Sequence, residues 1–131
     1  MAEQQALKVD ELASRLASEQ ANIEKVRDVL KAQFERYGFS EPLAAIEDPM
    51  VNPDLRKDSF DGSQSLYTEW RTPSGALLGY ILIHGGGQIY AEFDVLKPHP
   101  TKPQWVIEAI TAWGDADNIK AEPRLLPALG D

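Results

Sequence analysis

The chain has 131 residues, a formal net charge of −8, 43% apolar residues and no cysteine. This length suits a single domain, 1–131. The lack of cysteine excludes disulfides, thiolate metal sites and a cysteine nucleophile, and an acidic chain without clustered Lys or Arg argues against nucleic acid as a partner. The N-terminus lacks the features of a secretion signal, and no apolar run approaches the ~20 residues that span a bilayer. We therefore expect a soluble, cytoplasmic protein that does not bind membranes.

The first elements in chain order are a frayed segment, 1–8, and a long helix over 9–37, which contains no Gly or Pro. Gly38 is suited to end this helix. Its length would be about 43 Å at 1.5 Å per residue, against a radius of gyration of ~14 Å for the domain. The helix must therefore overhang its domain or break, and 18–22 is the weakest place.

Apolar residues recur along this helix at spacings of three and four, with Glu19 and Gln33 filling two gaps in the heptad pattern. The apolar positions of this seam are Val9, Leu12, Leu16, Ile23, Val26, Leu30 and Tyr37. One interpretation is an amphipathic helix, or helix pair, that packs on a sheet. The alternative is a short coiled coil between the N-terminal halves of two copies.

Three prolines and few apolar residues follow in 39–62, which we interpret as a long surface connection with one helical turn around 43–46. A three-stranded antiparallel meander comes next, at about 65–72, 76–84 and 88–96. Pro73, Ser74 and Gly75 form its first turn.

The register of the last two strands follows from side-chain alternation, because a one-residue slip would exchange their faces. Pairing Ile83 with Ile89 places Gly79 opposite Phe93 and requires a loop of odd length, 85–87, which is all glycine. For the first two strands, the same reasoning pairs Trp70 with Leu77. The predicted core face then carries Trp70, Leu77, Ile81, Ile83, Ile89, Phe93 and Val95.

The segment 103–113 is apolar nearly all round, with Pro103 in a first-turn position and Gly114 at its end, and is predicted to be a buried helix. We also consider a short fourth strand near 119–122. The predicted fold class is α+β: a long N-terminal helix, a three-stranded meander and this buried helix.

No arrangement with specific chemistry is found. His84 precedes three glycines, but no serine stands in a nucleophile elbow, and the glycine-rich phosphate-binding motifs are absent. His84 and His99 are predicted at opposite ends of the sheet, so a metal site with Glu92 and Asp94 is not expected. We predict no catalytic residue, no metal ligand and no cofactor.

The second face of the meander is the candidate working surface. Tyrosines and leucines surrounded by charge are typical of a binding surface. The candidates are Tyr67, Tyr80, Leu78, Leu82, Tyr90 and Glu92, with Tyr67 beside Tyr80 and Glu92 in one row. The alternative is that the C-terminal tail or 39–62 covers this face.

Two functional hypotheses follow from different classes. The first is a non-enzymatic protein-interaction or adaptor domain that self-associates through the helix or the tyrosine-bearing face. The second is a small-molecule-binding protein or minor enzyme that uses Tyr67, Tyr80, Tyr90 and Glu92, with His84 as a further candidate, around a pocket. The order of elements also resembles, in architecture, the small acidic chaperones of bacterial secretion systems, which implies a secretion-chaperone-like role as a third hypothesis.

Overall fold

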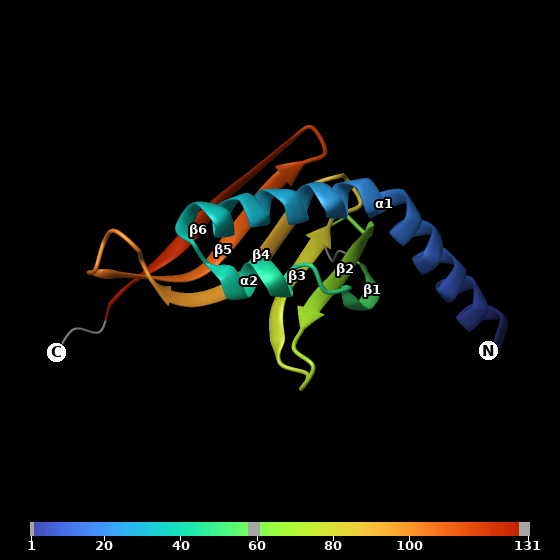
Figure 1. Ribbon diagram of the computed structural model, residues 1–131. Helices are drawn as coiled ribbons and strands as arrows, with labels where there is room; N and C mark the ends of the chain where they lie inside the picture. The colour runs from blue at the N-terminus through green and yellow to red at the C-terminus, as the bar shows by residue number, and fades with distance from the viewer. Residues whose placement is uncertain (1, 58–60, 129–131) are drawn as a thin grey trace.

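A long helix lies across one face of a six-stranded antiparallel sheet in the computed structural model, which describes residues 2–57 and 61–128, with side chains from residue 9 onward (Figure 1). The two helices are α1 (Ala2–Tyr37) and α2 (Ser40–Ala45). The strands are β1 (Val51–Lys57), β2 (Gln64–Arg71), β3 (Leu77–Ile83), β4 (Ile89–Pro98), β5 (Trp105–Asp115) and β6 (Asn118–Pro127). Each strand pairs with its neighbour in sequence, in the order β1-β2-β3-β4-β5-β6. The predicted α+β class, with a long N-terminal helix and an antiparallel meander, is confirmed.

Helix α1 is continuous through 18–22, so the break considered from the sequence does not occur. Its N-terminal part extends past the sheet instead (Figure 1), and Val9 is 64% exposed. Gly38 ends the helix as predicted, with a φ of +75° that favours glycine. The N–H of Gly38 donates to the Glu35 carbonyl and that of Phe39 to the Phe34 carbonyl, at 3.3 and 2.9 Å, which is the Schellman arrangement.

The apolar seam of α1 packs on the chain's own sheet. Ile23, Val26, Leu30 and Phe34 are buried in the core, and Leu12 and Leu16 pack against it. The interpretation that this helix packs on the sheet is thereby confirmed.

Arg15 fastens α1 to the sheet by hydrogen bonds to main-chain oxygens of β2, β3 and the following loop. Its guanidinium donates to the carbonyls of Gln64, Ile83 and His84 at 2.7, 3.0 and 3.3 Å. The planar guanidinium can serve several acceptors at once, so one side chain holds the helix against the ends of two strands.

The segment between α1 and β2 differs from the predicted surface connection. The helical turn around 43–46 is present as α2, but 51–57 forms the edge strand β1. Asn52, Pro53 and Asp54 are poor strand formers, and the ladder is irregular between Val51 and Asp54. Asn52 adopts a φ of +54° there. Because an edge strand tolerates proline and irregularity, its sequence lacks the alternation that identifies inner strands.

The β3–β4 hairpin has the predicted register. Ile83 pairs with Ile89 and Gly79 with Phe93. The N–H of His84 donates to the Gln88 carbonyl at 2.8 Å, which closes a loop over 85–87. Of the three glycines in that loop, Gly87 has the positive φ, at +97°.

The register predicted for β2 and β3 is wrong by two residues. Trp70 pairs with Gly79 rather than with Leu77, and a bulge separates this pair from the next one, Arg71 with Leu77. The bulge leaves Leu77 43% exposed, although it was predicted in the core. It also turns Leu78 toward the core cluster, although Leu78 was predicted on the opposite face.

The predicted helix 103–113 is wrong, because this segment forms strand β5. Its β-branched residues Val106, Ile107, Ile110 and Thr111 favour a strand. The side-chain alternation of β5 is shifted by two ladder irregularities. One lies between Asp94 and Lys97 on β4, and the other between Ile107 and Ala109 on β5. The segment therefore looks apolar all round, as a buried helix does.

Strand β6 extends the short fourth strand considered near 119–122 to ten residues. It continues through Pro123, which an edge strand accommodates. Six of the seven residues predicted for the core face are buried, Leu77 being the exception. Among the described residues, neither helix has the length and apolar character required to cross a membrane.

Candidate functional site

Both helices lie on one side of the sheet, and we call the other side the open face (Figure 1). Within the described parts of the chain, the two segments considered as its cover lie elsewhere. Residues 40–45 form α2 on the helix side, while 51–57 and 118–127 are strands of the sheet itself. The open face is therefore free of any other described element of the chain.

A row of aromatic side chains crosses the open face, and we call it the aromatic belt. It consists of Tyr67 on β2, Tyr80 on β3, Tyr90 on β4 and Trp113 on β5. The ring centroids of Tyr67 and Tyr80 lie 5.8 Å apart and those of Tyr80 and Tyr90 lie 6.1 Å apart. Tyr90 and Trp113 are register partners.

The belt ends in an arginine on β1. The guanidinium carbon of Arg56 lies 3.7 Å from the centroid of the Tyr67 ring, a cation–π contact. At the opposite end Trp113 is 36% exposed. The belt thus spans five of the six strands with residue types that interfaces favour.

Glu69 lies beside the belt and is only 4% exposed. Its carboxylate is hydrogen-bonded within the chain instead of to solvent. Its carboxylate accepts hydrogen bonds from Arg71 Nε at 2.5 Å, Tyr67 Oη at 2.6 Å and Asn52 Nδ2 at 2.7 Å. These bonds, that of Arg71 foremost, lower the pKa of Glu69 to about 2. Glu69 is therefore a structural group that stays ionised at neutral pH.

Glu92 is the centre of a second polar cluster. Tyr80 and Tyr90 each donate a phenolic hydrogen bond to Glu92 Oε2 at 3.4 Å, and Arg124 Nη2 donates to Oε1 at 2.5 Å. Arg124 also binds Glu108 at 2.8 Å, so one guanidinium from β6 bridges carboxylates of β4 and β5. Burial, followed by the charge of Glu92, raises the pKa of Tyr80 to about 12. The phenol consequently stays protonated at neutral pH.

Five of the six predicted binding-face residues occur together on the open face. Tyr67, Tyr80 and Tyr90 are in the belt, Glu92 bonds two of them, and Leu82 lies between Tyr67 and Tyr90 in the register. The predicted pairing of Tyr67 with Tyr80 across β2 and β3 is wrong. Tyr67 pairs with Leu82, and Tyr80 pairs with Glu69. The two rings meet on the diagonal instead. Leu78 is absent from this face because of the bulge.

Three members of the site were missed from the sequence. Arg56 lies on the unrecognised strand β1, and Trp113 lies on β5, which was interpreted as a helix. Arg124 lies on β6, beyond the end predicted for the short fourth strand. Reading 105–115 with a period of two would have placed Trp113 on the same face as Thr111, next to Tyr90 and Glu92.

The two histidines have separate surroundings. His84 Nδ1 lies 3.3 Å from the hydroxyl of Ser65, whereas His99 packs edge-on against the Tyr37 ring at 5.5 Å. His99 Nδ1 also accepts the main-chain N–H groups of Thr101 and Lys102, both at 3.2 Å. Within the described ranges, no three side chains of the metal-binding types converge.

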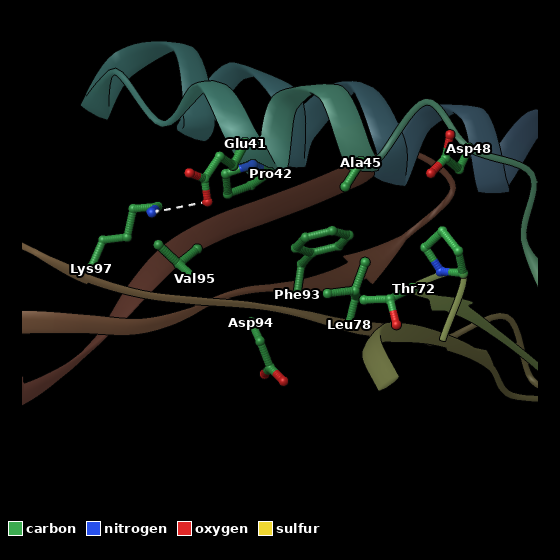
Figure 2. A pocket seen from close by; sticks show the side chains of 11 residues that line it. Glu41, Pro42, Ala45, Asp48, Thr72, Leu78, Phe93, Asp94, Val95 and Lys97 are labelled. Carbon is green, nitrogen blue, oxygen red and sulfur yellow. Dashed lines mark hydrogen bonds and ion pairs between the residues drawn. The ribbon is translucent and has the colours of Figure 1, made fainter. Parts of the chain in front are cut away.

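A second candidate site is a hollow of about 280 Å³ on the helix side, beneath α2. Figure 2 shows Pro42 and Ala45 of α2 above it and Phe93 in its floor, with Val95 on one side and Leu78 on the other. The side chain of Asp94 points away from it, toward the open face. The hollow and the aromatic belt are therefore on opposite sides of the sheet.

Comparison with protein-family models, curated proteins and solved structures finds no match. The functional interpretation therefore depends on the geometry of these two sites. The architectural similarity to secretion chaperones depended on a C-terminal helix, and this helix is absent because 105–115 is a strand.

Proposed function

We propose that this protein is a non-enzymatic protein-interaction domain that self-associates through the open face. The observation that carries the proposal is the aromatic belt on a sheet face that no other described element covers. Tyr, Trp and Arg dominate the energetics of protein interfaces, and the belt brings Arg56, three tyrosines and Trp113 together. Charged groups surround it, as in the polar rim of an interface.

The edges of the sheet are less suited to association than its face. Strand β1 contains Pro53 and an irregular ladder, and β6 contains Pro123. Lys120 and Glu122 add charges of both signs to β6. Proline, bulges and charge are the features by which edge strands avoid pairing with other chains.

The charge distribution of the open face allows a second copy to pack on it. On β1 and β2, Asp54 and Glu69 balance Arg56 and Arg71, whose side chains are 55% and 36% exposed. The strands β4 to β6 carry an excess of acids on this face: Glu92, Asp94, Glu108 and Glu122 against Lys120 and Arg124. A two-fold axis parallel to the strands would place the charge-balanced half of each copy over the acidic half of the other, so that the two acidic halves do not face each other. Two-fold dimers are the commonest homo-oligomers.

Association through α1 is the weaker route. Most of its apolar seam packs in the chain's own core, where Ile23, Val26 and Leu30 are buried. Of the seam residues, Val9 is the most exposed, at 64%. A coiled coil would have only the overhanging N-terminal part of α1 to build on.

The belt is also poorly suited to acid–base chemistry. General catalysis at neutral pH needs groups whose pKa lies near 7. Glu69 has its pKa lowered to about 2 and Tyr80 has its pKa raised to about 12, and both are engaged in internal hydrogen bonds. This favours interaction over catalysis at the open face.

The proposal is tested by measuring mass with light scattering across a hundredfold dilution. We expect a dimer that dissociates on dilution. The double variant Tyr67→Ser, Tyr80→Ser should be monomeric over the same range while keeping its circular dichroism spectrum. The matched control is Leu96→Ser, which removes a 71% exposed apolar side chain outside the belt and should leave the dimer intact.

Two outcomes contradict the proposal. The first is a wild-type monomer at every concentration. The second is a folded double variant that dimerises as well as the wild type, which would move the contact away from the aromatic belt.

A further inference from the structure

We infer that the hollow beneath α2 is a binding site for an arylalkyl ammonium group, that is, a ring joined by a short chain to a cation. This site is on the helix side of the sheet, so it does not depend on the function proposed for the open face. The chemical class follows from three properties of the hollow: apolar walls, a size near that of one side chain, and a carboxylate at its open end.

The roof of the hollow is α2, which has an ion pair at each end. Lys97 Nζ lies 3.2 Å from Glu41 Oε2 at the start of this helix, and Lys31 forms an ion pair with Glu47 just beyond its end. Helix α2 itself is anchored by apolar packing, because Pro42 and the following Ile46 are buried and Leu43 packs against the core. The result is a fixed roof above the sheet.

The floor and walls of the hollow are apolar. Phe93 and Val95 come from β4, and Leu78 reaches the helix side because of the bulge in β3 (Figure 2). Ala45 points into the space from above, and its small side chain leaves the room that a larger residue would fill. At about 280 Å³ the hollow is smaller than typical sites for whole metabolites, roughly 300–1,000 Å³, and it suits a single ring.

The two ends of the hollow differ in charge. At one end the Glu41–Lys97 ion pair leaves no net charge (Figure 2). At the other end is Asp48, which has no ion-pair partner among the described residues. A ligand whose ring enters the apolar part would bring a cation on a short chain close to this carboxylate. Such a group occurs in free aromatic amines and in peptides that begin with phenylalanine.

The experiment is a titration followed by the ¹⁵N–¹H chemical shifts of the full chain. The probe is 2-phenylethylamine, and the comparison ligand is 3-phenylpropionate, which has a similar ring and chain but the opposite charge. We expect saturable shifts for the amides of Ala45, Leu78 and Val95 with the amine. The propionate should bind more weakly because Asp48 repels it.

Two variants separate the ring contribution from the charge contribution. Asp48→Asn, an exposed substitution that should not disturb folding, is expected to weaken amine binding by about two- to five-fold, the range of an exposed ion pair. Ala45→Trp fills the hollow and should abolish binding. Addition of the dipeptide Phe-Gly in place of the amine shows whether the main-chain amine of a peptide serves as well.

The inference is overturned if the amine causes no saturable shifts, if the propionate binds as tightly as the amine, or if Asp48→Asn binds the amine as the wild type does. Equal binding by a folded Ala45→Trp variant would also overturn it. None of these outcomes bears on the mass measurements that test the open face.

Discussion

Gly79 of β3 faces Phe93 of β4, and the Phe93 ring and main chain fill the space that a side chain at position 79 would need. A Cβ there would lie 2.4 Å from the Glu92 carbonyl oxygen and 2.9 Å from Phe93 Cα. Both are main-chain atoms, so neither can turn aside. We predict that Gly79→Ala destabilises the fold by about 1–3 kcal/mol, the cost of forcing a group into a packed interior. Urea unfolding measures it, and an unchanged midpoint would mean that β3 and β4 are further apart than described.

The hairpin loop provides a second prediction, with a matched control one residue away. Gly87 has a φ of +97°, which costs an L-residue with a side chain about 1–2 kcal/mol. Gly86 has no positive φ, and a Cβ there would meet nothing within 4 Å. Gly87→Ala should therefore lower the unfolding free energy, while Gly86→Ala should leave it nearly unchanged. Equal effects of the two substitutions would show that the loop has another geometry.

The carboxyl of Glu69 should contribute a pH-dependent part of the stability. Its pKa is about 2 in the folded chain, below the ordinary value of 4.5, so the unfolded chain binds more protons as the pH falls. The contribution is complete above about pH 5 and is lost as the pH decreases through about 2. We expect Glu69→Gln to cost about 1–3 kcal/mol at pH 7, because it disrupts a buried hydrogen-bonded group.

That cost should shrink steadily between pH 5 and pH 2, as measured by urea unfolding at each pH. The exposed Glu122 provides the control, since Glu122→Gln should have little effect at any pH in this range. A difference between wild type and Glu69→Gln that stays constant down to pH 2.5 would contradict the assigned hydrogen bonds.

Arg15 should determine how firmly the first half of α1 is held. Removing its guanidinium in Arg15→Ala deletes hydrogen bonds to the carbonyls of Gln64 and Ile83, and bonds from charged donors are worth about 1.5–3 kcal/mol each at most. We predict faster amide hydrogen exchange in 9–20, with little change in 23–34, which the core holds independently. Arg36→Ala, at the other end of the helix, should not change exchange in 9–20.

The parts of the fold that could be predicted are those with a strong local signal. The β3–β4 register followed from alternation, which excludes a slip by one residue, together with the glycine loop and the placement of Phe93 opposite Gly79. The end of α1 followed from Gly38. Where two signals agreed, as in these cases, the structure has the predicted arrangement.

The errors arose where a ladder is irregular. One bulge between Trp70 and Arg71 shifts the β2–β3 register by two and exchanges the environments of Leu77 and Leu78. Such a bulge has no distinct sequence mark at this position. In β5 the shifted alternation made a strand look apolar on every side, which removed Trp113 from the predicted site.

The residues of the candidate site were predicted better than the distances between them. The three tyrosines, Glu92 and Leu82 share a face because residues two apart on a strand point the same way, and a register error of two residues leaves the faces unchanged. Their mutual distances could not be predicted, since these depend on the pairing between β2 and β3. The hollow beneath α2 could not be predicted at all, because the bulge and the placement of a six-residue helix create it.

The docking of α1 across the sheet has a consequence for how the chain acquires its structure during synthesis. Each strand pairs with the next one in sequence, so the hairpins can form as the ribosome releases them. The helix emerges first, yet Lys25 binds the carbonyl of Ala116 and Gln33 binds that of Ala121, 91 and 88 residues later. Until β6 has been synthesised, the apolar seam of α1 lacks part of the sheet against which it packs. The nascent chain therefore carries an unfinished core for most of its synthesis and completes it only when the last strand arrives.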